Sequence, residues 1–208
     1  NIIVKLIMKS VLFFSIILIS SLCFSQELYQ VKTITNYSKL IEDLEKDSAN
    51  VIYSLNKSEL DNIVKQSHKK YTLIHSFAVW CVPCVEGLPE YVNFRNEMKD
   101  EVLFLLLTMD KNKSAYLTNT HEDFVEKYHV NYPTFNISDE YAKGKKKKYN
   151  HFIQLIVPNH KDYGMGISIL IRNEDQKVLY ASTYKETKEE TTKKVKDIYK
   201  KYLKFLKF

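Results

Sequence analysis

The 208-residue chain is 45% hydrophobic, with 31 basic and 25 acidic residues. This length and apolar content suit one well-packed α/β domain with a small extension. With only four glycines and four prolines, the sequence has no long linker or low-complexity tract that would separate two domains. The modest positive charge is scattered and lacks an aromatic-interleaved basic stripe, so a nucleic-acid partner is not expected.

The first 25 residues have the order of a secretory signal peptide. A short basic start at residues 8–10 precedes an apolar run at 11–22, and Cys23 and Ser25 supply small residues at positions −3 and −1 before Gln26. The apolar run is shorter than the roughly 20 residues of a membrane span. We therefore expect residues 1–25 to be a cleaved signal peptide. An uncleaved membrane anchor and lipid attachment through Cys23 are the alternatives.

Periodicity then predicts two helices separated by a short strand. Residues 36–46 have helical apolar spacing, and 51–55 form a β-prone stretch. Ser58, with Asp61 three residues on, is predicted to cap a helix that runs to about Lys69.

The next apolar segment leads into the motif Trp80-Cys81-Val82-Pro83-Cys84. Residues 71–79 are typical of a buried strand, and a helix is predicted from the motif to about Lys99, with Pro89 inside it. Cysteines three positions apart in a first helical turn place both sulfurs on one face, close enough for a disulfide. The free N–H groups and the dipole of that turn favour a thiolate on Cys81.

Cysteine content points to reversible redox chemistry. If residues 1–25 are removed, Cys81 and Cys84 are the only cysteines that remain of the three in the sequence. A disulfide that closes so small a loop restrains little chain, so stabilisation is a poor reason to have it. The alternative is a protein whose two thiolates take up Cu(I) or Zn(II), although no other cysteine or close Met-His cluster completes such a metal site.

Beyond the motif, residues 102–109 are apolar without alternation, which predicts a strand covered on both faces. Thr120 is predicted to cap a helix through His129. Its inward-facing residues are expected to be Phe124, Val125 and Tyr128.

The segment that follows predicts two short strands, at 132–137 and 152–157. They flank a lysine-rich helix or loop that contains the chain's one basic run, 143–148. This run is expected to be a solvated loop or helix end, with contact to nucleic acid or an anionic surface as the alternative.

The C-terminal part predicts a hairpin and a helix. Strands at 167–172 and 177–182 enclose a polar turn. A final helix over about 186–206 presents one apolar face, expected to pack on the sheet rather than on a membrane surface, made of Val195, Ile198, Tyr199, Tyr202 and Leu206.

This order of elements, the stretch Phe77 to Cys84 and Pro89 five residues later resemble the thioredoxin superfamily, most closely its exported TlpA/ResA-like thiol-disulfide oxidoreductases. The resemblance covers about residues 58–208. It implies an α/β thioredoxin-like fold, with a central mixed β-sheet flanked by helices. An N-terminal extension at 26–57 and an insertion before the C-terminal hairpin complete the expected organisation.

The resemblance also implies roles for the motif. Cys81 would be the nucleophile and Cys84 the resolving thiol, while Trp80 would shape the substrate surface and Pro83 would stiffen the turn and tune the redox potential. It implies reduction of disulfides in other exported proteins, most simply in the periplasm, with a membrane or periplasmic electron donor and no cofactor. An oxidant or isomerase, and a binding module that kept the fold without turnover, are the alternatives.

Two departures from the family pattern concern the site. His75 stands where thioredoxins have a buried aspartate, and strand alternation points it to the same side as Phe77 and Val79. A neutral imidazole there could accept a proton, or it could be a core histidine satisfied by a neighbour.

The cis-proline that faces the cysteines has no counterpart near Ile167-Ser168. We interpret Pro133 as an ordinary strand-start proline and the cis-proline as replaced; the alternative is that Pro133 is the cis-proline.

Overall fold

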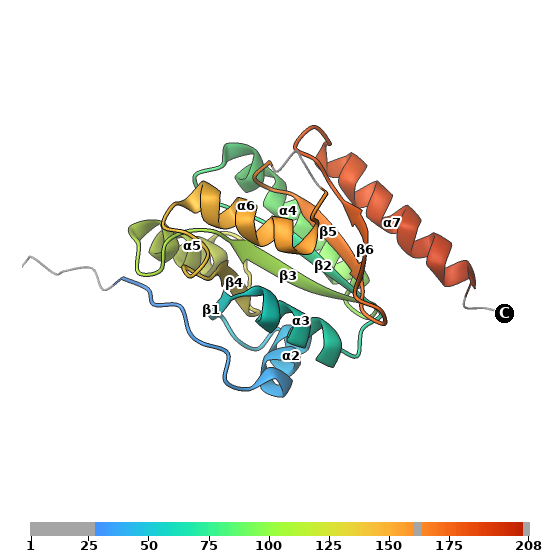
Figure 1. Ribbon diagram of the computed structural model, residues 1–208, viewed down its shortest axis with the longest axis horizontal. Helices are drawn as coiled ribbons and strands as arrows, with labels where there is room; N and C mark the ends of the chain where they lie inside the picture. The colour runs from blue at the N-terminus through green and yellow to red at the C-terminus, as the bar shows by residue number, and fades with distance from the viewer. Residues whose placement is uncertain (1–27, 160–163, 206–208) are drawn as a thin grey trace, which may run out of the picture.

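The computed structural model describes residues 28–159 and 164–205, so the predicted signal peptide and Leu206 lie outside the described residues. A six-stranded sheet lies at the centre, and helices cover both of its faces (Figure 1). The strands, in spatial order, are β1 (Ile52–Leu55), β4 (Thr134–Ile137), β3 (Val102–Thr108), β2 (Tyr71–Ser76), β5 (Ser168–Arg172) and β6 (Lys177–Ala181).

The sheet is mixed, as predicted. The strands β1, β4, β3 and β2 pair in parallel, whereas β5 runs antiparallel to both β2 and β6. The helices are α2 (Tyr37–Lys46), α3 (Lys57–Gln66), α4 (Val82–Met98), α5 (Ala115–Glu126), α6 (Lys145–Ile156) and α7 (Lys188–Phe205). Helix α4 packs against α7, and α3 packs against α6. The predicted fold class is therefore confirmed.

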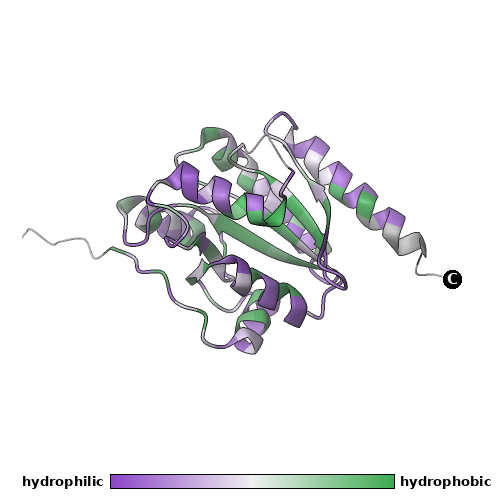
Figure 2. Cartoon of the chain, viewed as in Figure 1, coloured by the Kyte–Doolittle hydropathy of each residue, from purple (hydrophilic) through white to green (hydrophobic). Residues whose placement is uncertain are grey.

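The core lies along the two central strands. Every residue of β2 and β3 is buried, as the largely apolar stretches at 71–79 and 102–109 predict. Figure 2 shows this distribution, with hydrophobic residues on the central strands and hydrophilic ones on the outer faces of the helices. Among the described residues, no helix combines the length and apolarity needed to cross a membrane.

The predicted cap of α3 is wrong by two residues. Asn56, not Ser58, caps the helix: its side chain accepts a hydrogen bond from the Glu59 amide at 2.8 Å, and the Glu59 carboxylate accepts one from the Asn56 amide at 2.7 Å. This reciprocal capping box satisfies two amides that the helix leaves free. Asn56 and Glu59 are three positions apart, like the predicted pair Ser58 and Asp61, but they begin the helix two residues earlier.

The predicted start of α5 is also wrong. Ser114 caps this helix by accepting from the Leu117 amide, and Thr120 lies inside it, where its hydroxyl donates to the carbonyl of Tyr116 at 2.8 Å. Phe124 is fully buried as expected, whereas Val125 is exposed.

The predicted strand at 152–157 is wrong, because residues 152–156 belong to α6 and Val157 is the C-cap of that helix. Tyr149, Phe152, Ile153 and Ile156 are buried and recur at helical spacing on one face. The short apolar run at the end of α6 is typical of a strand by itself, and its helical spacing appears only when Tyr149 is included. Helix α6 lies between β4 and the β5–β6 hairpin, where the insertion was expected.

Within the predicted extension 26–57, β1 pairs with β4 and is part of the sheet. The predicted hairpin is present, with β5 paired to β6, and α7 buries Val195. No peptide bond in the described residues is cis, so Pro133 precedes β4 as an ordinary trans proline. This agrees with the favoured interpretation and excludes Pro133 as a cis-proline.

Candidate functional site

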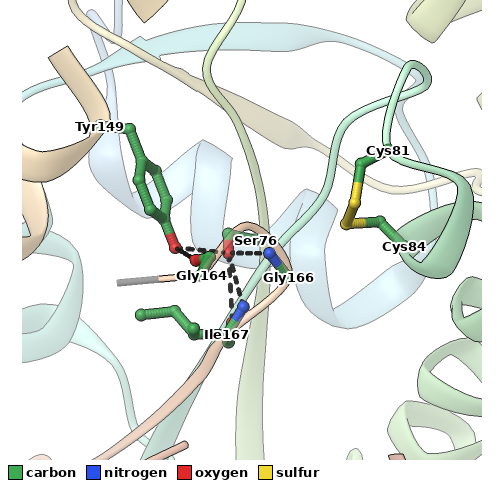
Figure 3. Close-up of a disulfide and its surroundings, with 7 residues drawn as sticks. All are labelled: Ser76, Cys81, Cys84, Tyr149, Gly164, Gly166 and Ile167. Atoms are coloured by element: carbon green, nitrogen blue, oxygen red, sulfur yellow. Dashed lines mark hydrogen bonds between the residues drawn. A yellow bond between two sulfur atoms is a disulfide. The ribbon is translucent and has the colours of Figure 1, made fainter. Parts of the chain in front are cut away.

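The two motif cysteines lie at the start of α4, just beyond the end of β2. Phe77, the first residue after the strand, still donates to the Leu107 carbonyl at 2.8 Å, and the chain then turns away from the sheet. Cys81 and Cys84 form a disulfide with an S–S distance of 2.12 Å and a Cα–Cα distance of 5.2 Å (Figure 3). The i, i+3 spacing in the sequence therefore gives the pairing that it predicted.

The two sulfur-bearing residues differ in accessibility. Cys84 is only 5% exposed, whereas Cys81 is half-buried and occupies the N-cap position of α4. The Cys81 carbonyl accepts from the amides of Cys84 and Val85, at 2.9 and 3.0 Å. No acidic side chain lies in this first turn, so the dipole of α4 favours negative charge on Cys81 when the disulfide is opened.

Trp80 forms one wall of the site and is held by a buried carboxylate. Its indole Nε1 donates to Asp110 Oδ1 at 3.1 Å, and the ring remains 37% exposed. Asp110 is fully buried, and Lys145 Nζ lies 2.5 Å from Oδ1. The same ammonium lies 3.7 Å from the ring centroid of Tyr116 and 5.2 Å from that of Trp80. An ion pair and cation–π contacts thus fix the aromatic residue next to Cys81.

The expectation of a solvated lysine run is wrong for Lys148, which is 1% exposed. Its Nζ donates to the Asp110 carbonyl and to Asp139 Oδ1, both at 2.7 Å. Burial lowers the pKa of Lys148, and the Asp139 carboxylate opposes that effect. Helical spacing explains the difference, because Lys145 and Lys148 share a face of α6 while Lys146 and Lys147 lie on the exposed side.

We expect Lys145→Met to lower the free energy of unfolding by about 3 kcal/mol, because the buried Asp110 carboxylate loses its cationic partner. Urea denaturation followed by Trp80 fluorescence measures the change. Lys146→Met, at an exposed position one residue along the helix, is the matched control and should leave the unfolding midpoint unchanged. Equal effects of the two substitutions would contradict the role given to Lys145.

The segment 164–167 lies against Cys84. Gly166 has a φ of +85°, and a Cβ placed on it would lie 2.9 Å from the Cys84 sulfur. Only glycine therefore allows the backbone to approach this sulfur so closely. At the place near Ile167-Ser168 where the cis-proline was predicted to be replaced, the structure has this segment with Gly166.

His75 lies in β2, opposite Ser168 of β5, and is fully buried. Its Nδ1 lies 3.0 Å from the Ser168 hydroxyl, and its ring stacks on Tyr91 with centroids 3.4 Å apart. Its Nε2 has no hydrogen-bond partner among the described residues. Burial lowers the pKa of His75 to about 3, so the imidazole is neutral at physiological pH. Ser168 is a neighbour that satisfies Nδ1, as the core-histidine alternative expects, whereas Nε2 has no such neighbour among the described residues.

His75 and Cys84 line the same cavity, which has a volume of about 320 Å³. Tyr91 of α4, Gly166 and the first residues of α7 complete its walls. The sequence motif identified Cys81, Cys84, Trp80, Pro83 and His75, and the structure brings Pro83, Cys84 and His75 to this cavity. Asp110, Lys145, Ser76 and Tyr149 were not identified. Of these, only Asp110 carried a sequence signal, since it directly follows a buried strand.

The depressed pKa of His75 predicts a pH-dependent stability. Because the unfolded chain takes up a proton near the ordinary value of 6.5 and the folded chain only near 3, stability is lost as the pH falls below about 6.5. Between about pH 6 and pH 4, the free energy of unfolding should fall by about 1.4 kcal/mol per pH unit more in the wild type than in His75→Phe. Urea denaturation across this range checks the slopes, and parallel slopes would contradict a buried neutral His75.

No group of three or more His, Cys, Asp or Glu side chains that could hold a metal ion occurs within residues 28–159 and 164–205. The alternative of Cu(I) or Zn(II) binding therefore rests on the two thiolates alone and stays a prediction.

The thioredoxin family model matches residues 51–152. A comparison with curated proteins finds no significant match. Among solved structures, the chain is similar to the pneumococcal exposed lipoprotein thioredoxin Etrx1 from Streptococcus pneumoniae strain TIGR4, at 14% identity and a TM-score of 0.45, over 64% of this chain and 89% of that chain. It is also similar to a thiol-disulfide oxidoreductase from Bacteroides fragilis NCTC 9343, at 18% identity and a TM-score of 0.43, over 64% and 87% of the two chains.

A putative protein disulfide isomerase from Bacteroides thetaiotaomicron matches at 17% identity and a TM-score of 0.42, over 62% of this chain and 73% of that chain. The residues matched by the family model include β2, the disulfide and α4. Together with the mixed sheet and the cysteine pair at the start of α4, this match assigns the chain a thioredoxin-like fold and supports its membership of the thioredoxin superfamily.

Proposed function

We propose that this protein is a thiol-disulfide oxidoreductase that cycles Cys81 and Cys84 between a disulfide and a dithiol. The observation that carries the proposal is the disulfide at the N-terminus of α4, in which Cys81 is half-buried and Cys84 is buried. A thiolate at a helix N-terminus is stabilised and accessible to another protein, while its buried partner is held within bonding distance.

In the reducing direction, the Cys81 thiolate attacks one sulfur of a substrate disulfide. A mixed disulfide forms, and the other substrate sulfur leaves as a thiolate. The Cys84 thiolate then attacks the Cys81 sulfur and re-forms the intramolecular disulfide, so that the second substrate sulfur leaves. The substrate gains two electrons and, with two protons, becomes a dithiol, while the Cys81–Cys84 pair is oxidised.

We assign His75 as the group that accepts the proton of the Cys84 thiol. Both residues line the 320 Å³ cavity, and the Nε2 of His75 has no hydrogen-bond partner among the described residues. With the proton on Nδ1, next to the Ser168 hydroxyl, Nε2 presents a lone pair that can take the thiol proton. The negative charge that develops on Cys84 would stabilise the imidazolium for as long as it exists.

We further propose that the protein is an exported reductant of TlpA/ResA-like type, which acts on disulfides of other exported proteins in the periplasm. Its support is the signal-peptide pattern of residues 1–25 and the Trp80 to Cys84 motif. In that compartment, the cycle needs a membrane or periplasmic electron donor to return Cys81 and Cys84 to the dithiol.

Catalysed reduction of insulin by dithiothreitol tests the proposed activity. The wild-type protein should shorten the lag before insulin precipitates, and the Cys81→Ser protein should not. Equal lags for the two proteins would overturn the oxidoreductase proposal. Tight stoichiometric Cu(I) binding by the reduced protein, with no insulin reduction, would replace it with the metal-binding alternative.

A further inference from the structure

Two buried hydroxyl groups hold the backbone of the segment that faces Cys84 (Figure 3). Ser76, the last residue of β2, accepts hydrogen bonds through Oγ from the amides of Ile167 and Gly166, at 2.9 and 3.2 Å. Tyr149, from α6, donates its hydroxyl to the Gly164 carbonyl at 2.8 Å and lies 3.1 Å from Ser76 Oγ.

This network is internally consistent. The Tyr149 proton goes to the Gly164 carbonyl, and the Ser76 proton has two acceptors, the Tyr149 oxygen at 3.1 Å and the Ile167 carbonyl at 3.3 Å. Both side chains are fully buried, and burial raises the pKa of Tyr149, so its hydroxyl remains a donor at physiological pH. Buried hydrogen bonds of this kind are costly to break, because water does not replace the lost partner.

The network acts next to the sulfur that closes the catalytic cycle. A Cβ on Gly166 would lie 2.9 Å from Cys84 Sγ and 3.8 Å from the Ser76 carbonyl oxygen. Since Gly166 has no side chain of its own to pack, the position of its backbone depends on the hydrogen bonds that Ser76 and Tyr149 make to residues 164–167.

We propose that Tyr149 and Ser76 are positioning residues that hold the segment 164–167 against Cys84 and so set the accessibility of its thiol. Helix α6 also supports the residue before Cys81, because its Lys145 pairs with Asp110, which accepts the hydrogen bond of the Trp80 indole. The consequence for catalysis rests on the proposed oxidoreductase function, whereas the restraint on the segment does not.

The test compares Tyr149→Phe and Ser76→Ala with Tyr141→Phe in the full chain. The Tyr141 hydroxyl accepts a partly buried hydrogen bond from the Lys57 amide at 2.6 Å, and its ring packs on Phe152 of α6. It therefore controls for the loss of a structural hydroxyl near the same helix, because its hydrogen bond is made to Lys57 and not to the segment 164–167.

Two measurements report the position of the segment. Amide hydrogen exchange at Gly166 and Ile167 should become roughly fivefold to tenfold faster in Tyr149→Phe, the size expected for the loss of one buried hydrogen bond. In a Cys81→Ser background, alkylation of Cys84 by iodoacetamide should accelerate by a similar factor. Tyr141→Phe should change neither rate.

Unchanged exchange and alkylation in both Tyr149→Phe and Ser76→Ala would overturn the inference, as would equal acceleration in Tyr141→Phe. The outcome is separable from that of the proposed function. If the variants open the segment but the wild-type protein fails to reduce insulin, the positioning role stands and the oxidoreductase proposal falls. If insulin is reduced and the rates do not change, the positioning role falls alone.

Discussion

In the Cys84→Ser protein, we expect a disulfide substrate to accumulate on Cys81 as a mixed disulfide. The Cys81 thiolate at the start of α4 can still attack, but the serine hydroxyl cannot displace the bound substrate sulfur. Turnover of insulin should therefore fall to the rate of the protein-free reaction. Non-reducing electrophoresis and intact mass measurement after reaction with a disulfide peptide detect the adduct.

Cys81→Ser is the matched control for this experiment. Its remaining thiol, Cys84, is only 5% exposed and lies beneath Gly166, so a protein substrate should form little adduct with it. Adducts of equal yield on the two single variants would contradict the division into an attacking Cys81 and a resolving Cys84. Absence of adducts on Cys84→Ser would favour a binding module without turnover.

In the oxidised protein, Gly166→Ala should lower the free energy of unfolding by about 2–6 kcal/mol. A positive φ costs a residue with a Cβ about 1–3 kcal/mol, and forcing an extra carbon into a packed site adds about 1–3 kcal/mol. The added Cβ would meet Cys84 Sγ at 2.9 Å, so either the segment 164–167 or the disulfide has to shift. Urea denaturation under oxidising conditions measures the loss.

Gly144→Ala provides a control that adds the same carbon elsewhere. Gly144 has a negative φ at the N-cap of α6, and no atom lies within 4 Å of a Cβ placed there. Its cost should be no more than about 1 kcal/mol, the difference expected at an N-cap position. If Gly166→Ala is as mild as Gly144→Ala, the close approach of the backbone to Cys84 is not a constraint on the fold.

Local sequence signals were sufficient for the strand, the disulfide and the helix that follows it. The largely apolar stretch before Trp80 marks a buried central strand, and the spacing of Cys81 and Cys84 places both sulfurs on one helical face. The apolar run before Asp110 likewise gives the neighbouring strand β3. Both strands lie at the centre of the sheet and are buried on both faces, which is what an apolar stretch without alternation indicates.

Local signals were insufficient where a competing pattern was nearby. The apolar end of α6, including Phe152 and Ile153, was assigned to a strand because a run of a few apolar residues does not distinguish a strand from a buried helical segment. The caps Asn56 and Ser114 were missed in favour of other polar residues, since several residues near each helix start can supply a capping oxygen.

Most of the residues that support the site could not be found from spacing at all. Ser76 meets Tyr149 across 73 positions and Ile167 across 91, and Lys148 reaches the Asp110 carbonyl across 38. Such pairs depend on how α6 packs beside the sheet, which no local periodicity specifies. The lysine run was expected to be solvated for the same reason, because nothing in its own sequence shows the buried acceptors that α6 brings to Lys148.

Equilibration of the Cys81–Cys84 couple in glutathione or dithiothreitol buffers of defined potential tests the central claim most directly. We predict a single two-electron transition near that of thioredoxin, at roughly −270 mV, as expected for a pair that reduces other disulfides. A pair near −120 mV would be an oxidant and would contradict the proposed direction. A pair that stays oxidised below about −300 mV would be a structural disulfide and would contradict the redox cycle itself.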